Sequence, residues 1–182
     1  MIYRLLFILI LVSCKTEIKN ITVFQTDVGL KLINGELFYK GELFSGRLVD
    51  FYKNDSLRYQ AFYIDGRKEG IEQYFYKNGQ VNTCRMYKKG VKIGVHDGWW
   101  QDGSRKFQYH FNEKGQYHGS VKEWFKNGQL FKIFNYLNGK EKGKQRMYEV
   151  NGDIRANYEV INGERFGLIG LKKCYTLKKD SI

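Results

Sequence analysis

The side chains that most often do chemistry are few here, and they form no recognisable catalytic or metal-binding pattern. The histidines His96, His110 and His118 have no cysteine or carboxylate at a spacing typical of metal ligands. No serine lies in a Gly-x-Ser-x-Gly sequence, and no glycine-rich loop precedes a helical pattern. Asp97 and Glu123 could form a carboxylate pair, but glycoside hydrolysis needs a cleft. We therefore expect a protein that is not an enzyme, with no catalytic residue, metal or cofactor.

Cysteine chemistry is expected at one position near the N-terminus. Leu5 to Val12 is an unbroken apolar run of eight residues that follows Arg4. The run is too short for a transmembrane helix, which takes about 20 apolar residues. A short basic region before such a run is typical of a secretory signal sequence. The chain is therefore expected to be exported.

The apolar run ends in Leu11-Val12-Ser13-Cys14, which resembles the lipobox of bacterial lipoproteins. The resemblance implies that residues 1–13 are a signal peptide, and that Cys14 is lipidated and anchors the mature chain in a membrane. Lys15 stands where inner-membrane lipoproteins of enteric bacteria carry aspartate, which favours the outer membrane over the inner one. The alternative is an ordinary signal sequence with an incidental cysteine.

A short phrase recurs along the chain, which indicates that the elements around these residues are repeated. Tyr74 to Val81 reads YFYKNGQV, and Glu123 to Leu130 reads EWFKNGQL. Three ladders of residues advance by 24 residues, with one step of 25 at the same place in each. The ladders are Asn54, Asn78, Asp102, Asn127 and Asn151; Gly46, Gly70, Gly94, Gly119, Gly143 and Gly167; and Tyr63, Tyr87, Phe111, Tyr136 and Val160. Ladders that slip together predict stacked structural modules.

Turn signals predict that each module is a pair of antiparallel strands. Asn-Gly between apolar alternations is a strong hairpin signal, because a type I′ turn needs positive φ at both central residues. Further turn signals lie halfway between these sites, at Asp65-Gly66, Lys89-Gly90, Asn138-Gly139 and Asn162-Gly163. This spacing leaves no room for a helix. We expect an all-β protein, an antiparallel meander of hairpins in one long sheet that curls on itself and so closes its core.

The repeated phrase resembles the bacterial variant of the MORN repeat, in which Gly-x-x-x-Gly precedes two aromatic residues, Asn-Gly and an aliphatic residue. GRKEGIEQYFYKNGQV and GQYHGSVKEWFKNGQL carry this pattern. The opening NGELFYKGELFSG, from Asn34 to Gly46, resembles lipoproteins of the YwqK type, often labelled antitoxin-like. The resemblance covers Asn34 to about Lys173 and implies a repeat domain over 34–182. The segment before it, 14–33, is expected to be a tether with at most one edge strand, because residues 15–31 carry no repeat signal. It implies no mechanism of toxin neutralisation.

Side chains alternate along a strand, so the sheet is expected to have two different faces. One face is mostly apolar, and we interpret it as the core. Its members include Tyr59, Ala61, Tyr63, Tyr52, Tyr76, Trp100 and Phe125. The other face carries one aromatic residue per module, and two-residue turns would place each of them opposite a residue of the next strand. The expected pairs are Phe51 with Arg58, Phe75 with Asn82, Trp99 with Lys106, Trp124 with Phe131, and Tyr148 with Arg155.

These pairs form the candidate binding face. An aromatic–cation pair contributes about 0.5–1 kcal/mol at an exposed site, rings supply contact area, and cations hold carboxylate or phosphate groups. The formal net charge of +12 agrees with an anionic partner. We expect a lipid-anchored, non-catalytic protein of the cell envelope that binds another protein or an anionic glycan. Nucleic acid is not expected, because the chain is exported.

Two alternative functions remain open, a structural spacer and a module that associates with a membrane surface. In both, the rings of the candidate face would only stabilise the sheet. Lys140, Lys142, Lys144 and Arg146 alternate along one strand. They are expected to form a basic sheet edge that discourages aggregation, or to contact anionic lipid head groups.

Overall fold

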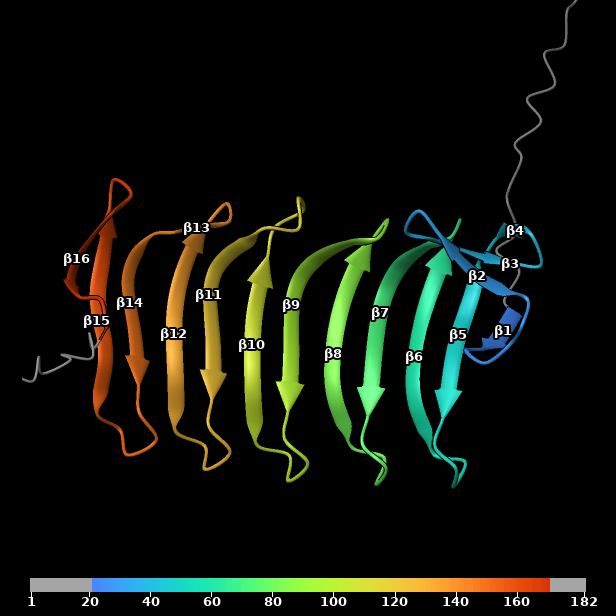
Figure 1. Ribbon diagram of the computed structural model, residues 1–182, viewed down its shortest axis with the longest axis horizontal. Helices are drawn as coiled ribbons and strands as arrows, with labels where there is room; N and C mark the ends of the chain where they lie inside the picture. Colours follow the sequence, from blue (N-terminus) through green and yellow to red (C-terminus); the bar gives the residue numbers. More distant parts are fainter. Residues whose placement is uncertain (1–20, 171–182) are drawn as a thin grey trace, which may run out of the picture.

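The computed structural model describes residues 21–170, which form strands joined by turns (Figure 1). The expected signal peptide, Cys14 and the last residues of the chain lie outside this range. The strands are β1 (Ile21–Phe24), β2 (Leu30–Ile33), β3 (Glu36–Tyr39), β4 (Glu42–Leu43), β5 (Gly46–Phe51), β6 (Leu57–Ile64), β7 (Arg67–Phe75), β8 (Val81–Lys88), β9 (Val91–Trp99), β10 (Arg105–Phe111), β11 (Tyr117–Trp124), β12 (Leu130–Leu137), β13 (Lys140–Glu141), β14 (Gly143–Tyr148), β15 (Ile154–Ile161) and β16 (Glu164–Leu168). None of the described residues forms a helix that could span a membrane.

The predicted all-β meander is confirmed. From β5 to β16 the strands of a 13-stranded sheet follow one another in sequence order and pair antiparallel, with the short β13 beside β12. The pairs β5–β6, β7–β8, β9–β10, β11–β12 and β14–β15 are modules one to five. The exception is β1, which pairs in parallel with β5. The segment expected as a tether, 14–33, therefore contributes two strands, β1 to this sheet and β2 to a smaller one.

The expected closure of the sheet on itself is wrong. Strands β1 and β16 lie at opposite ends of an elongated molecule (Figure 1). Each strand pairs only with its neighbours in the sheet order, so no contact draws the first and the last strand together. The sheet stays open, and one of its faces is buried only locally.

The largest apolar cluster lies at the N-terminal end, where the three-stranded sheet β2–β3–β4 packs on β5 and β6. Its buried members are Val23, Leu37, Phe44, Leu48, Tyr59 and Ala61. Backbone bonds tie the small sheet to the turn after β6, since Leu37 N–H donates to the Gly66 carbonyl and Gly66 N–H donates to the Phe44 carbonyl, each over 2.8 Å. A smaller cluster at the other end consists of Ala156, Tyr158 and Val160. We call the face that carries Tyr59 and Tyr158 the core face.

The turns at one end of the strands differ from those at the other end. At Asp65-Gly66 both residues have positive φ, 48° and 74°, as a type I′ turn requires. At Asn78-Gly79 only the glycine has positive φ, 85°. There Gly79 N–H donates to the Tyr76 carbonyl (2.9 Å) and Tyr76 N–H donates to the Gln80 carbonyl (2.8 Å). This is a three-residue loop, a type I turn followed by a bulge, so the expected two-residue turn is wrong at this end of the strands.

A side-chain bond favours the longer loop. The Asn78 side-chain oxygen accepts the Gln80 backbone N–H over 3.2 Å, and the same bond forms at Asn127, Asp102 and Asn151. Asn and Asp stabilise turns in this way by binding the backbone two residues on.

The longer loop shifts the strand pairing by one residue, and a second bulge restores it. Phe75 lies opposite Val81, whereas Tyr74 lies opposite Thr83, so Asn82 is the extra residue. The same shift occurs in all five modules. The extra residues are Arg58, Asn82, Lys106, Phe131 and Arg155. Beyond the bulge, the pairing is the one that two-residue turns would give.

The glycine ladder and the aromatic ladder are partners across each module. Gly70 pairs with Tyr87, Gly94 with Phe111. Gly70 has a φ of 76°, and a Cβ built on it would meet nothing within 4 Å, so the glycine is required by its backbone conformation and not by lack of space. The remaining pairs are Gly46 with Tyr63, Gly119 with Tyr136, and Gly143 with Val160.

Candidate binding surface

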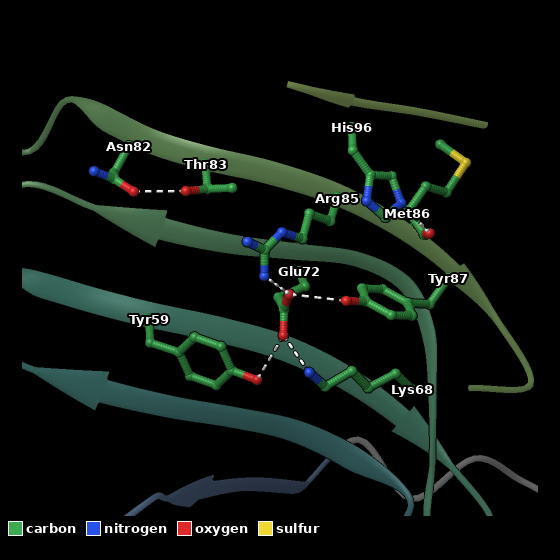
Figure 2. A network of polar contacts seen from close by, with 9 residues as sticks. All are labelled: Tyr59, Lys68, Glu72, Asn82, Thr83, Arg85, Met86, Tyr87 and His96. Atoms are coloured by element: carbon green, nitrogen blue, oxygen red, sulfur yellow. Dashed lines mark hydrogen bonds and ion pairs between the residues drawn. The ribbon is translucent and has the colours of Figure 1, made fainter. Parts of the chain in front are cut away.

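A buried carboxylate organises the core face in module two (Figure 2). The Glu72 side chain on β7 is 1% exposed. It forms an ion pair with Lys68, and it accepts bonds of 3.3 Å each from Arg85 Nη1, Tyr59 Oη and Tyr87 Oη. Burial alone would raise the pKa of Glu72, but the Lys68 and Arg85 charges outweigh it and the pKa is lowered.

The surroundings of Glu72 keep its neighbours in their ordinary protonation states. Burial, followed by the Glu72 charge, raises the pKa of Tyr87 to about 12. Burial likewise raises the pKa of Tyr59. Both phenols therefore remain donors near neutral pH, and the carboxylate remains an acceptor. A carboxylate saturated with donors stabilises the sheet and has no proton to transfer.

The histidines lie apart in the structure. His96 occupies the position of Glu72 one module later; its Nε2–H donates to the Met86 carbonyl over 2.9 Å, and burial lowers its pKa. Its ring lies 4.5 Å from the Phe111 ring, centroid to centroid, and tilted by 48°; the Phe111 ring in turn stacks on that of Tyr117. His110 and His118 bond instead to the Ser120 carbonyl and the Asn138 side chain. Within residues 21–170 no three His, Cys, Asp or Glu residues are placed to hold a metal ion.

The candidate binding face has one aromatic residue per module: Phe51, Phe75, Trp99, Trp124 and Tyr148. These residues lie on the face of the sheet opposite the core face, as expected, but the residues expected to pair with them do not lie there. Because the loops have three residues, each aromatic residue pairs with the residue one position before the expected one. The observed pairs are Phe51 with Leu57, Phe75 with Val81, Trp99 with Arg105, Trp124 with Leu130, and Tyr148 with Ile154. The five expected pairs, three of them aromatic–cation pairs, are therefore wrong.

The extra residue of the bulge points to the core face instead. Lys106 Nζ lies 4.6 Å from the centroid of the Trp100 ring. The Phe131 ring lies 5.0 Å from that of Phe125. The remaining contacts are ion pairs of Arg58 with Asp50 and of Arg155 with Glu149. A bulge turns a side chain that regular alternation would place on the other face.

Two rows of side chains thus meet on the core face beside the three-residue turns. The turn row consists of Tyr52, Tyr76, Trp100, Phe125 and Glu149. The bulge row consists of Arg58, Asn82, Lys106, Phe131 and Arg155. The sequence pattern identified the four aromatic residues of the turn row as core, but their side chains are only half-buried. Rings and cations do share a face, although not the face or the pairs that alternation alone predicts.

The turn row joins successive modules until module three. The Tyr52 hydroxyl donates to the Phe75 carbonyl over 2.8 Å, and the Tyr76 hydroxyl donates to the Trp99 carbonyl over 2.9 Å. Trp100 breaks the series, because its Nε1 atom is enclosed and has no hydrogen-bond partner among residues 21–170. The bond that links the earlier modules is therefore missing between modules three and four.

A pocket of about 340 Å³ lies at this break. Its lining residues are Trp100, Lys106, Phe107, Tyr109, Glu123, Trp124, Phe125, Lys126 and Phe131. The Glu123 carboxylate is already held by the Tyr109 hydroxyl (2.6 Å) and by Lys132 Nζ (2.8 Å). The pocket is therefore mostly aromatic. Its cations, Lys106 and Lys126, have no ion-pair partner in the part of the chain that the structure describes.

The basic strand does not form a sheet edge, so that expectation is wrong. β14 lies between β12 and β15 and pairs with both. The side chains of Lys140, Lys142, Lys144 and Arg146 are exposed. In the described part of the chain none of them forms an ion pair.

Comparison with known proteins adds no assignment. No family model matches the chain, and the search of curated proteins gives no significant match.

Proposed function

We propose that this chain is a non-catalytic, lipid-anchored protein of the bacterial cell envelope, related to the MORN-like repeat lipoproteins, that binds an anionic protein or glycan. Cys14 would hold it in a membrane, with the outer membrane favoured. The turn row and the bulge row of the core face would contact the partner.

The recurrence of a ring at one place in modules one to four, with a cation of the bulge row in modules one, three and five, carries this proposal. Trp100 with Lys106 and Phe125 with Phe131 occupy equivalent sites on neighbouring modules. Equivalent residues recur on every second strand, about 9.6 Å apart for a strand spacing of about 4.8 Å. A ladder of this kind suits an extended partner, because rings supply contact area while cations bind its anionic groups.

Co-purification from the native envelope after cross-linking tests the proposal. The variant Lys106→Gln/Arg155→Gln removes cations from the bulge row, and Phe75→Ala/Trp99→Ala alters the opposite face. We expect the first variant to lose a partner that the second retains, with both variants keeping the β-sheet circular dichroism of the parent. Equal recovery of that partner with the parent and both variants would contradict the proposed surface.

The anchor is tested separately. Incorporation of a labelled fatty acid into the parent, and its loss in Cys14→Ser, is the expected result. Release of Cys14→Ser from the membrane fraction should accompany that loss. A parent chain that incorporates no label would remove the anchor from the proposal while leaving the binding surface unaffected.

The exposed cations around β14 favour a second candidate function, association with an anionic membrane surface. Each cation near such a surface contributes about 1 kcal/mol. This function predicts salt-sensitive binding to vesicles containing phosphatidylglycerol. That binding should fall in Lys144→Gln/Arg146→Gln and stay unchanged in Lys106→Gln/Arg155→Gln. Binding that responds to neither pair would rule out a role for β14 at the membrane.

A further inference from the structure

We propose that the pocket between modules three and four binds acidic peptide segments, with a large apolar side chain in the pocket and neighbouring carboxylates on Lys106 and Lys126. This inference rests on the proposed function and names the ligand class for one part of the same surface. The pocket lies on the core face, beside the turns that follow β9 and β11.

The size and lining of the pocket fit one apolar side chain. Its volume of about 340 Å³ lies near the lower end of ligand sites, which span about 300–1,000 Å³. Six of the nine lining residues are aromatic: Trp100, Phe107, Tyr109, Trp124, Phe125 and Phe131. Burial of an aromatic or long aliphatic side chain among them would supply the binding free energy.

The polar groups of the pocket disfavour a glycan. A sugar ring brings several hydroxyl groups, and each one that is buried without a partner costs free energy. The Tyr109 hydroxyl already donates to the Glu123 carboxylate, and Lys132 forms an ion pair with the same carboxylate. The pocket therefore offers few groups that could bind sugar hydroxyls.

The charges favour a carboxylate-bearing partner. In the bulge row, Arg58 and Arg155 are neutralised by Asp50 and Glu149, whereas Lys106 lies over a tryptophan ring. Residues 21–170 place no carboxylate at ion-pair distance from Lys106 or Lys126. Module three is thus the place where the bulge cation remains available to a partner.

Lys126 is similarly available. It contributes to the lowered pKa of Asp102, after the bonds that Asp102 receives from Ser104, but no ion pair joins the two side chains. Its side chain is exposed, while that of Lys106 is half-buried. The two cations therefore offer one partly desolvated and one solvated contact to a peptide with acidic residues on both sides of its apolar one.

The unpaired Trp100 Nε1–H points to the same place. Burying a donor without a partner costs free energy. A chain selected for stability alone would keep the tyrosine of the first two modules, whose hydroxyl finds a carbonyl. Departures of this kind from local rules are expected at functional sites.

The indole N–H signals of the full chain test the inference. Its three tryptophans, labelled with ¹⁵N at the indole, give signals that Trp100→Phe helps to assign. The probes are acetyl-Glu-Phe-Glu-amide, acetyl-Gln-Phe-Gln-amide and acetyl-Glu-Ala-Glu-amide. We expect the first to shift the Trp100 signal saturably, and the others to bind at least tenfold more weakly. Equal shifts with all three peptides, or none with the first, would overturn the inference.

Matched variants separate the pocket from general charge. Lys106→Gln/Lys126→Gln should weaken the first peptide at least tenfold. Lys53→Gln/Lys77→Gln, which removes two lysines at the turns of modules one and two, should change the affinity less than twofold. Phe131→Asn, which copies Asn82 of module two, should also weaken binding. Equal affinity in all three variants would contradict the assigned pocket.

A separate arm distinguishes failure of this inference from failure of the proposed function. If an oligomer of glucuronic acid shifts the Trp100 signal and the peptides do not, the peptide assignment is overturned while the binding surface stands. If no probe shifts the signal but partner recovery still depends on the bulge row, the inference alone fails.

Discussion

Lys106 Nζ lies 4.6 Å from the centroid of the Trp100 ring, on the core face. A two-residue turn would instead place Lys106 opposite Trp99, on the other face of the sheet. The three-residue turn at Asp102-Gly103 and the bulge at Lys106 account for this arrangement together. One extra residue per hairpin thus gives the core face a row of cations and rings that strict alternation would divide between the two faces.

The Lys106–Trp100 contact should contribute measurably to stability. Lys106→Gln is expected to lower the free energy of unfolding by about 0.5–1 kcal/mol, because the site is partly exposed. Urea unfolding measures the change. In a Trp100→Leu background the same substitution should have almost no effect, since the ring is gone. An equal loss in both backgrounds would show that the contact is not the cause.

Replacing the buried carboxylate should be more costly. Glu72→Gln leaves Lys68 and Arg85 without their counter-charge, and removal of one partner of a buried pair costs about 3–5 kcal/mol. Both cations retain some contact with water, so we expect a loss of about 2–3 kcal/mol in urea unfolding. The control Glu113→Gln removes an exposed pair with Lys88 and should cost under about 0.5 kcal/mol. Similar costs for the two variants would contradict the assigned role of Glu72.

The buried imidazole of His96 should make stability depend on pH. Burial lowers its pKa below the usual value near 6.5, and the Arg85 and Lys92 charges act in the same direction. The stabilisation is therefore complete above about pH 6.5 and is lost as pH falls through the lowered pKa, because the unfolded chain binds the proton first. His96→Val, which copies Val121 of module four, should flatten this part of a stability–pH curve. An unchanged slope would show that other groups cause it.

Two glycines should be sensitive for different reasons. Gly70→Ala is expected to cost about 1–2 kcal/mol because its φ is 76°, and Gly70→Asn should cost less, since asparagine tolerates this region. Gly98→Ala should cost about 1–3 kcal/mol because the added Cβ would clash with the Phe107 ring. There asparagine, being larger, should be worse than alanine. Thermal unfolding of the four variants gives the two orders, and the same order at both positions would contradict one of these reasons.

The period and the inward face could be predicted from the sequence because both follow from local chemistry. Asp65 before Gly66 and Asn138 before Gly139 tolerate positive φ and so specify type I′ turns. Alternation from such turns places Tyr59, Tyr87 and Tyr158 on the buried side. Beyond each bulge the strand pairing is the one that two-residue turns would give. The prediction that Tyr59 and Ala61 lie on the core face is confirmed for this reason.

The turn-proximal pairing could not be obtained in the same way. Asn-Gly is compatible with a two-residue turn and with a three-residue loop, and the two differ by one residue in register. The side-chain bond from Asn78 to the backbone of Gln80 favours the loop, but it is recognisable only when the backbone is known. The missing closure has another cause, since repeats that specify only neighbouring contacts carry no information on whether the two ends meet.

Photo-cross-linking from one position on each face tests the central claim most directly. The photoreactive residue benzoyl-phenylalanine would replace Phe131 on the core face, or Trp99 on the opposite face, in the full chain within intact envelopes. If the bulge row binds the partner, position 131 gives a discrete adduct that excess acetyl-Glu-Phe-Glu-amide suppresses, and position 99 gives none. An adduct from position 99 with none from position 131 would contradict the account.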